Sequence, residues 1–494
     1  MGDAMMQFGQ FLPDQSEFNN AGVTVANNVI PAAVGYESMQ DLSPISGAAD
    51  ENIVGMIAAA DDDGNTALYA ADRTKIYQYN TTTSALDNVS KAGNYSTGAD
   101  DRWRFVQFGE DVIGTNFANP IQYIAAYTGS NFADLSADAP KAKYIAVVRD
   151  FVMTGYTNDV TDGNKPYRVR WSGIGDHTSW AISAATQADF QDIADLGDVT
   201  GLVGGEYATI LLEKGIVRAS YIGSPLIFQF DKLETVRGCK VPGSVCNVGH
   251  NVFFYSDDGF YMFDGEKSIP IGSEKINRFF LEDWDGAYAK NMSASADPLR
   301  QIIVWPYASR QAINGKPDKL LIYNYALEKW STASVAVDLV APIYTAGYTL
   351  EGLDAAFGSL DVLPASLDGA IYRGGEFLFA ASKDKKIQTF TGNTLPATID
   401  TAEFEGQKGF FSLVRNIVPY VTLRDSGNGT VTAQVFSRNR QVDTYTSGNT
   451  NSLNSENLIP ARSNGRYHKV RLNISGEWKK AQGIDVDFGV MGRR

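Results

Sequence analysis

Two pairs of carboxylates have a spacing that would suit acid–base chemistry. Asp283 and Asp285 form one pair, and Glu403 and Glu405 form the other. On a strand, side chains two residues apart point to the same face and lie about 6–7 Å from each other, which is close to the separation that glycoside hydrolases use. In an acidic chain, however, such pairs are far more often part of a solvated face. The spacing therefore predicts no catalytic residue by itself.

Two acidic turns are similar to ligand-binding loops. Residues 61–65 read DDDGN, like the start of a calcium loop, but the glycine at position six and the glutamate at position twelve are missing. Residues 256–259 read SDDG and are similar to the Asp-box of sialidase propellers, with one residue too few between aspartate and glycine. We interpret both segments as turns, which Asp and Gly favour.

The tryptophans and the basic residues near the end of the chain could each form a binding surface. The indoles would suit a sugar platform, but most stand near the ends of predicted strands, so we expect them in the core. The basic set would either touch DNA or face an acidic surface of a neighbouring subunit. The tryptophans are Trp103, Trp171, Trp180, Trp284, Trp305, Trp330 and Trp478. The basic set is Arg462, Arg466, Lys469, Arg471, Lys479, Lys480, Arg493 and Arg494.

Signatures of nucleotide-binding loops, zinc proteases and serine hydrolases are missing from the sequence. Cys239 and Cys246 are too few for a disulfide framework in a chain of 494 residues, and we expect both to be reduced. The three histidines, His177, His250 and His468, are too scattered for a zinc site. We therefore predict no catalytic, cofactor-binding or metal-binding residue, and no enzyme activity.

One hairpin recurs along the chain. Residues 249–272 read GHNVFFYSDDGFYMFDGEKSIPIG, in which two aromatic runs are joined by Asp-Gly turns that tolerate positive φ. Related units begin roughly 40–55 residues apart, with one longer gap before the last, near the period of propeller blades. The seven units are residues 65–80, 103–126, 143–180, 199–230, 249–272, 301–330 and 375–392.

The predicted fold is all-β, with an irregular six- or seven-bladed β-propeller-like region over residues 50–392. Two unrelated β-sandwiches are the alternative, because the repeat has no WD or kelch signature. Residues 1–49 are rich in Asn, Ala and Pro and predict an extended arm laid along another part of the molecule. Residues 393–399 read as a linker, and residues 400–494 predict a C-terminal β-sandwich domain.

Bulk composition limits the setting in which the chain works. We find no apolar run of about 20 residues and no signal-peptide pattern, so we expect no membrane insertion and synthesis in a reducing cytoplasm. The net charge is −15, with 13 Lys and Arg against 8 Asp and Glu from residue 401 onward, which leaves −20 on residues 1–400. Such an acidic surface repels phosphates and does not grip nucleic acid.

Several phrases resemble those of bacteriophage virion proteins. They are DRWRFVQFGEDVIGTNFANPIQYI (101–124), GEYATILLEKGIVRASYIGSPLIFQFD (205–231), RGCKVPGSV (237–245), VFFYSDDGFYMFDG (252–265) and the terminal GRYHKVRL with GVMGRR. Through them the chain resembles the tail hub, or nozzle, proteins of short-tailed phages, which are also called head-completion or packaged-DNA stabilisation proteins. The resemblance spans most of residues 8–494 and rests on aromatic-glycine phrases, not on a catalytic signature.

The resemblance implies a structural virion protein of the phage tail, made in the host cytoplasm. Six copies would form a ring below the portal and adaptor, retain packaged double-stranded DNA and provide the channel for its ejection. Other tail proteins, such as fibres or a plug, would be further partners. Six copies at −15 give a ring near −90, and a DNA conduit needs an acidic lumen to stay non-adhesive. The alternative is a propeller-based phage protein that binds or hydrolyses glycans.

Overall fold

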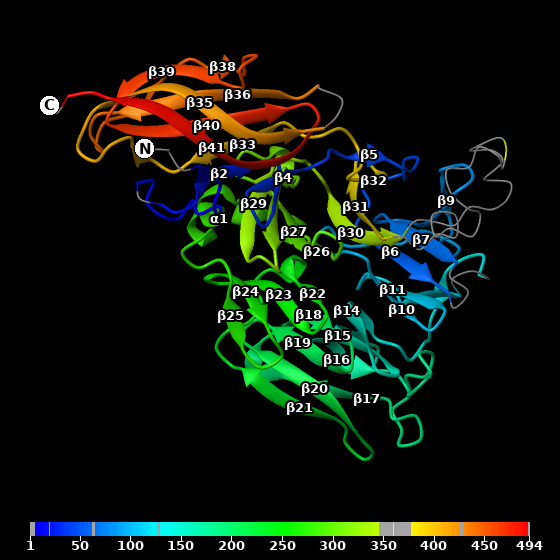
Figure 1. Ribbon diagram of the computed structural model, residues 1–494. Coiled ribbons are helices and arrows are strands. Elements are labelled where there is room, and N and C mark those ends of the chain that lie inside the picture. Colours follow the sequence, from blue (N-terminus) through cyan, green and yellow to red (C-terminus); the bar gives the residue numbers. More distant parts are fainter. Residues whose placement is uncertain are drawn as a thin grey trace.

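Seven groups of four antiparallel strands dominate the computed structural model (Figure 1). The structure describes residues 5–18, 20–61, 65–125, 129–344, 359, 377–424 and 428–492. Residues 62–64 of the predicted acidic turn, together with Arg493 and Arg494, lie outside these ranges. Within them the chain is all-β, as the alternation of aromatic runs and turns predicts.

The first four blades follow one another without interruption, and each is a sheet in which sequential strands pair as neighbours. Their strands are β6 (Gly55–Ala60), β7 (Thr66–Ala71), β8 (Ile76–Tyr79) and β9 (Leu86–Asn88); β10 (Arg104–Phe108), β11 (Asp111–Thr115), β12 (Gln122–Ala125) and β13 (Ala133–Asp134); β14 (Lys141–Val148), β15 (Phe151–Asp159), β16 (Gly163–Trp171) and β17 (Asp189–Asp192); and β18 (Val199–Val203), β19 (Tyr207–Leu212), β20 (Ile216–Gly223) and β21 (Ile227–Glu234).

The last three blades differ from the first four in how they are completed. Blade six continues into a larger sheet, and the fourth strand of blade seven comes from the N-terminal segment. Their strands are β22 (Cys246–Val248), β23 (Asn251–Ser256), β24 (Gly259–Phe263) and β25 (Ser268–Pro270); β26 (Ser295–Asp297), β27 (Ile302–Tyr307), β28 (Lys319–Asn324) and β29 (Lys329–Ala333); and β30 (Leu339–Tyr344), β31 (Phe377–Lys383), β32 (Lys386–Thr389) and β5 (Ser43–Pro44).

The helices are short. Among the described residues, only α1 (Asn277–Asp283) is an α-helix. Short 3-10 segments are η1 (Ala194–Leu196), η2 (Pro242–Ser244), η3 (Gly286–Asn291) and η4 (Ile313–Gly315).

The blades close into a ring of seven. Each blade-to-blade interface within the described ranges has its own cluster of buried apolar side chains. The closing interface joins Ile343 and Ala380 of blade seven to Leu68 and Ala70 of blade one, and the first strands β30 and β6 lie side by side there. A ring lets small sheets cover one another's faces and leaves only short edges exposed. The predicted six or seven blades are therefore seven.

The propeller and the C-terminal domain share one sheet. The arm strand β2 (Val23–Asn27) pairs with β29 of blade six on one side and with β33 (Ala397–Thr401) on the other. The sheet then continues through β40 (Tyr467–Ser475) and β36 (Thr430–Arg438). The short strands β34 (Phe404–Glu405), β37 (Thr446–Ser447) and β38 (Asn451–Ser452) complete it.

A second sheet packs against this one and makes the C-terminal region a sandwich. It too takes strands from both ends of the chain. Its strands are β1 (Met6–Gln7), β3 (Val29–Pro31), β4 (Tyr36–Ser38), β35 (Ser412–Leu423), β39 (Ile459–Gly465) and β41 (Trp478–Val490). Residues 1–49 thus contribute strands to the propeller and to both sheets of the sandwich. Three residues of the predicted linker, 397–399, lie in β33.

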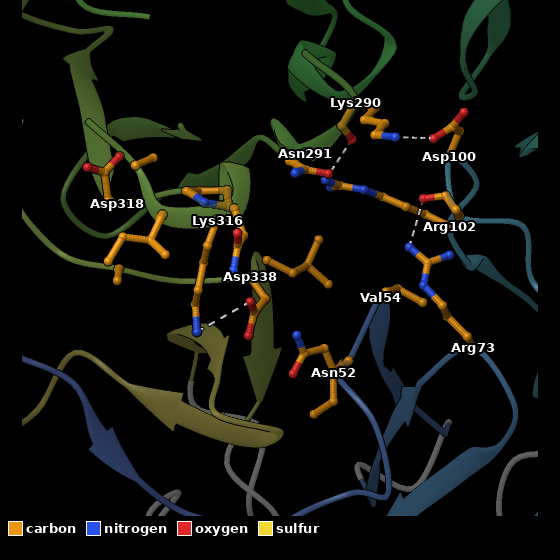
Figure 2. Close-up of a pocket in the computed structure, with 18 of the residues that line it drawn as sticks. Asn52, Val54, Arg73, Asp100, Arg102, Lys290, Asn291, Lys316, Asp318 and Asp338 are labelled. Atoms are coloured by element: carbon orange, nitrogen blue, oxygen red, sulfur yellow. Dashed lines mark hydrogen bonds and ion pairs between the residues drawn. The ribbon is translucent and has the colours of Figure 1, made fainter. Parts of the chain in front are cut away.

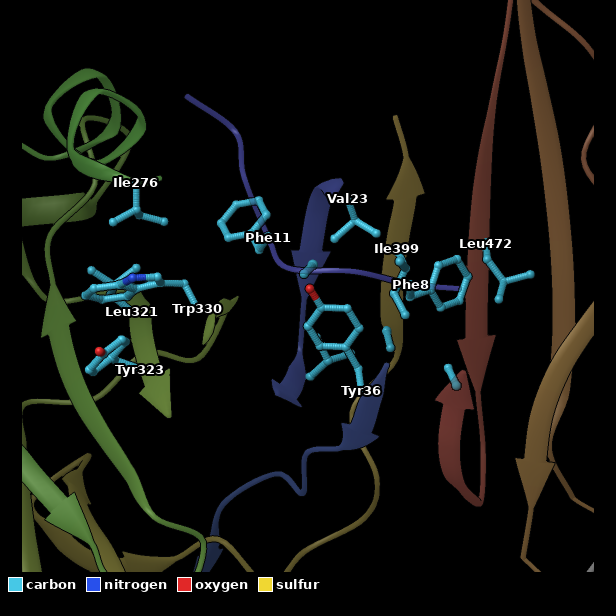
Figure 3. Packing of buried hydrophobic residues seen from close by; sticks show 14 of the residues in the cluster. Phe8, Phe11, Val23, Tyr36, Ile276, Leu321, Tyr323, Trp330, Ile399 and Leu472 are labelled. Atoms are coloured by element: carbon cyan, nitrogen blue, oxygen red, sulfur yellow. The ribbon is translucent and has the colours of Figure 1, made fainter. Parts of the chain in front are cut away.

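One apolar cluster joins the three parts (Figure 3). Phe11, Val23 and Tyr36 of the arm lie between Trp330 of blade six and Leu472 of the C-terminal domain. All five side chains are buried. Burying large aromatic groups stabilises by roughly 1.5–3 kcal/mol each, and a ring shared by two regions contributes to holding them together. The arm is therefore part of the core.

Candidate functional site

The first carboxylate pair has structural partners. Asp283 accepts hydrogen bonds from the Tyr307 hydroxyl at 2.8 Å and from Lys319 Nζ at 2.8 Å. Asp285 caps η3 by accepting a hydrogen bond from the Ala287 amide at 3.1 Å. Both carboxylates hold local structure.

The second pair lies in the C-terminal domain and is also engaged. Glu403 is fully buried, and its Oε2 accepts from Arg438 Nη2 at 2.8 Å while its Oε1 accepts from the Tyr445 hydroxyl at 3.0 Å. Glu405 pairs with Arg466 at 3.2 Å. These contacts link neighbouring strands of the domain.

The second acidic turn is a hairpin turn between β23 and β24. Asp258 accepts from the Tyr261 hydroxyl at 2.7 Å, and Asp257 lies 3.2 Å from Lys240 Nζ. Gly259 has φ +140°, and a Cβ there would lie 2.0 Å from the Asn277 amide nitrogen. Only glycine fits that turn.

Most of the tryptophans are core residues. Trp103, Trp171, Trp180, Trp305 and Trp330 belong to the clusters between blades, as the pattern predicts. Trp478 is buried in the C-terminal domain, and Trp284 packs half-buried against the same cluster. Within the described ranges the buried indoles therefore offer no flat exposed platform for a sugar.

The cysteines and histidines do not gather into a site. Cys239 and Cys246 are free and buried, and burial raises the pKa of each thiol to about 12. His468 is buried in the C-terminal domain, with Nε2 2.8 Å from Ser412 Oγ, and burial lowers its pKa to about 4. His177, which lies between β16 and β17 of blade three, packs near Phe108 of blade two. Across the described residues no group of three His, Cys, Asp or Glu side chains could hold a metal ion.

The basic set near the end of the chain is largely neutralised by the chain's own carboxylates. Arg466 pairs with Glu405, and Arg471 pairs with Asp400 at 2.8 Å. Of the described members, only Arg462 and Lys479 have no intrachain ion pair. The two remaining pairs join the C-terminal domain to the N-terminal arm: Lys469 to Glu17 and Lys480 to Glu37. Most of the basic side chains that would face an acidic surface of a neighbouring subunit thus pair with carboxylates of their own chain.

A cavity of about 680 Å³ lies between the starts of the first strands of blades one, two, six and seven (Figure 2). Its walls come from blades one, two, six and seven. The lining residues precede β6, β10, β26 and β30 or lie in the turns after β7 and β27. The charged lining residues are Arg73, Asp100, Asp101, Arg102, Lys290, Lys316, Asp318 and Asp338. We call this space the axial cavity.

Most charged groups of the axial cavity have partners. Lys290 pairs with Asp100, and Arg73 Nη2 donates to the carbonyl of Ala99 at 2.9 Å. Asp318 Oδ2 accepts from the Ser309 hydroxyl at 2.7 Å. These contacts fix the walls.

Two groups differ from the others. The Arg102 guanidinium donates to the Lys290 carbonyl at 3.0 Å and has no ion pair with any described carboxylate. Burial, followed by the nearby Arg104 and Arg73, lowers its pKa to about 10, so it stays charged at neutral pH. Asp338 Oδ1 lies 3.5 Å from Lys316 Nζ, whereas its buried Oδ2 has no hydrogen-bond partner. Burial raises the pKa of Asp338.

A second cavity of about 330 Å³ lies between the first strands of blades two to five. Arg104 of β10 lies against the Tyr144 ring of β14, at 4.5 Å from its centroid. Gly204 allows close packing on the β18 side, since a Cβ there would lie 2.0 Å from the Val147 carbonyl oxygen. The lining of this cavity combines polar and apolar groups.

The sequence did not single out the residues of the axial cavity. They are isolated polar residues, such as Arg102 and Asp338, which stand one or two positions before a first strand. Their only signal is this recurring position at successive blade starts. It becomes visible only when the blade boundaries are known.

Comparison with known proteins gives no family. No protein-family model matches the chain, and no curated protein matches it. Solved structures that align with the chain include the WD40 domain of Neurospora crassa Pan2, at 6% identity over 72% of this chain and 97% of that one, with a TM-score of 0.39. An extracellular domain of a hybrid two-component system from B. thetaiotaomicron aligns at 10% identity over 86% of this chain and 48% of that one, with a TM-score of 0.40.

The computationally designed Ika8 protein also aligns, at 8% identity over 74% of this chain and 99% of that one, with a TM-score of 0.33. The propeller assignment rests on the blades and interfaces of the chain itself. Among the helices that the structure describes, none has the length and apolarity to span a bilayer.

Proposed function

We propose that the protein is a structural component of a phage tail, and that it forms a ring-shaped hub or nozzle. Six copies would sit below the portal and adaptor, retain packaged double-stranded DNA and let it pass at ejection. The observation that carries the proposal is the set of aromatic-glycine phrases that resemble nozzle proteins. Most of these phrases contribute strands to blades two, four and five and to the C-terminal domain, and residues 237–245 include η2.

Charge supports the same proposal. The chain carries −15, and a ring of six would present a strongly acidic wall to DNA. Like charge keeps the phosphates from adhering, which a conduit requires. No sequence-specific DNA contact is part of this proposal.

Subunit contacts would use surfaces other than the neutralised basic set. Heterologous contacts close into rings when the rotation between copies fits. Lys469 and Lys480 already pair with the arm. Among the described residues of the basic set, only Arg462 and Lys479 have no intrachain ion pair. Apolar side chains at hairpin tips, such as Leu226 and Val160, are exposed and suit contacts with neighbouring copies or with fibre and plug proteins.

Imaging of particles tests the proposal. The chain should be present in purified virions, and electron microscopy of the tail should place it in a six-fold ring with an axial channel and an acidic lumen. The absence of the chain from virions, or a lumen lined by basic side chains, would contradict the proposal.

A further inference from the structure

Two oppositely charged groups line the axial cavity without forming an ion pair with each other. Arg102 comes from the segment before β10 of blade two, and Asp338 from the segment before β30 of blade seven. Each influences the titration of the other, so they are within electrostatic range. They are nevertheless more than 4 Å apart and form no ion pair. Figure 2 shows the two side chains entering the cavity from different walls.

The Arg102 guanidinium has spare hydrogen-bonding capacity. It carries five N–H donors, of which one is used on the Lys290 carbonyl. Arg73, its neighbour in the cavity wall, has several backbone carbonyls as acceptors. A partly buried guanidinium without an anion carries a desolvation cost that a bidentate carboxylate would offset.

The Asp338 carboxylate has an unused hydrogen-bond acceptor. Its Oδ2 is buried and unpartnered, although buried polar atoms nearly always have a partner. Lys316, at 3.5 Å from Oδ1, also pairs with Asp384 at 3.3 Å, so its charge is shared between two carboxylates. Asp338 therefore has an unused acceptor atom in the cavity wall, which a hydroxyl or ammonium group would satisfy.

The remaining walls set the size and type of ligand. The volume of about 680 Å³ is within the range of about 300–1,000 Å³ that small-molecule sites occupy. Ile53, Val54 and Leu339 give an apolar wall, and Asn52 adds an amide. The described lining contains no aromatic ring on which a nucleobase would stack.

We infer that the axial cavity binds a small organic carboxylate that also carries a hydroxyl or ammonium group. Arg102 holds the carboxylate with its two-pronged donor face, and Asp338 accepts the hydrogen bond from the second group. A free amino acid and an acidic sugar share this chemistry. The inference depends only on the propeller and is independent of the proposed role in a phage tail.

Calorimetric titration of the full-length protein tests this inference. The probes are L-glutamate for the amino-acid source, D-glucuronate for the sugar source and D-glucose as an uncharged control. We expect at least one carboxylate to bind and glucose not to bind, and the carboxylate that binds identifies the source. Binding by neither carboxylate, or equal binding of glucose and glucuronate, would overturn the inference.

Variants assign the binding to the cavity. Arg102→Gln should weaken carboxylate binding by about tenfold or more, and Asp338→Asn by a smaller factor, because a charge-assisted bond is lost in each. Arg440→Gln is the matched control, since Arg440 is exposed in the C-terminal domain and pairs locally with Asp443; it should bind as the parent does. Unchanged binding by Arg102→Gln would refute the assignment.

A second variant covers the case in which Arg102→Gln does not fold. Arg102→Lys keeps the charge but loses the two-pronged geometry, so it should bind with an intermediate affinity. The thermal midpoint provides the second measurement, because a ligand that binds only the folded state raises it by an amount that grows with the ratio of ligand concentration to Kd. The parent protein should show this rise with the bound carboxylate, and Arg102→Lys should show a smaller one. Equal rises would contradict a role for Arg102.

Discussion

The axial cavity and the junction between arm and C-terminal domain treat buried charge in opposite ways. At the junction, Glu403 is held by Arg438 and Tyr445, and Asp400 accepts two hydrogen bonds at 2.8 Å from Arg471. In the axial cavity, Arg102 has a single carbonyl acceptor. The junction uses charge to specify one packing, whereas the cavity keeps charge available. That difference separates a region built for rigidity from one suited to a ligand.

The largest expected effect is at the junction. Glu403→Gln leaves the largely buried Arg438 guanidinium without its counter-charge, and breaking a buried pair in this way costs about 3–5 kcal/mol. Urea unfolding followed by circular dichroism measures the loss. Glu477→Gln is the control, because the Glu477–Arg424 pair is substantially exposed and should cost about 1 kcal/mol or less. Equal losses for both variants would remove the contrast between buried and exposed pairs.

The next effect is a dependence on pH. Burial lowers the folded-state pKa of His468 to about 4 from 6.5, so the unfolded chain takes up a proton first as the pH falls. The contribution to stability is full above pH 6.5 and is lost towards pH 4, by about 2–3 kcal/mol.

Comparison of unfolding free energies at pH 7 and pH 4.5 measures this loss. His468→Gln does not titrate, so its stability should fall less over the same interval. A variant with the same pH dependence as the parent would show that other groups cause the loss.

A smaller effect is expected inside the arm. The buried Tyr36 hydroxyl donates to the Gly9 carbonyl at 2.9 Å and ties β4 to the segment that follows β1. Tyr36→Phe leaves that carbonyl unpaired and should cost about 1–2 kcal/mol in urea unfolding. Tyr420→Phe, at an exposed position, should change stability by less than about 0.5 kcal/mol.

The smallest effect is expected in the axial cavity. Arg102→Gln removes a poorly solvated charge, so the unfolding free energy should stay within about 1 kcal/mol of the parent value or rise slightly. Thermal melting without added ligand measures it. A loss above about 2 kcal/mol would make Arg102 a structural residue and would remove the difference between the two regions.

The sequence predicts the blades well because their cause is local. In the hairpin of β23 and β24, runs of apolar residues on each side of an Asp-Gly turn leave few alternatives, and Gly259 supplies the backbone conformation that the turn requires. The seven repeated units of the sequence correspond to the seven blades. The sequence leaves their number at six or seven because a longer gap precedes the last unit. Residues 345–358 and 360–376, which lie in that gap, are outside the described ranges.

The closing strand and the cavity could not be predicted because their cause is distant. Ser43 and Pro44 carry no sign that they pair with Thr389 and Gln388. Arg102 looks like any exposed arginine until the ring brings blade seven beside blade one. The alternation of apolar and polar residues predicts which face of a strand is buried. It does not predict which residues a closed ring places opposite one another.

The shared sheet has a consequence for how the chain acquires its structure during synthesis. The arm is made first, yet β1 pairs with β41, and β2 needs β33, more than 370 residues later. The propeller has all its strands only once β32 (Lys386–Thr389) is made, and the sandwich only once β41 (Trp478–Val490) is made. Such distant pairing slows folding and keeps unpaired strand edges exposed for longer. A nascent chain truncated before β41 should therefore be easily digested by proteases, and a prematurely terminated copy would lack the strands needed to complete the sandwich.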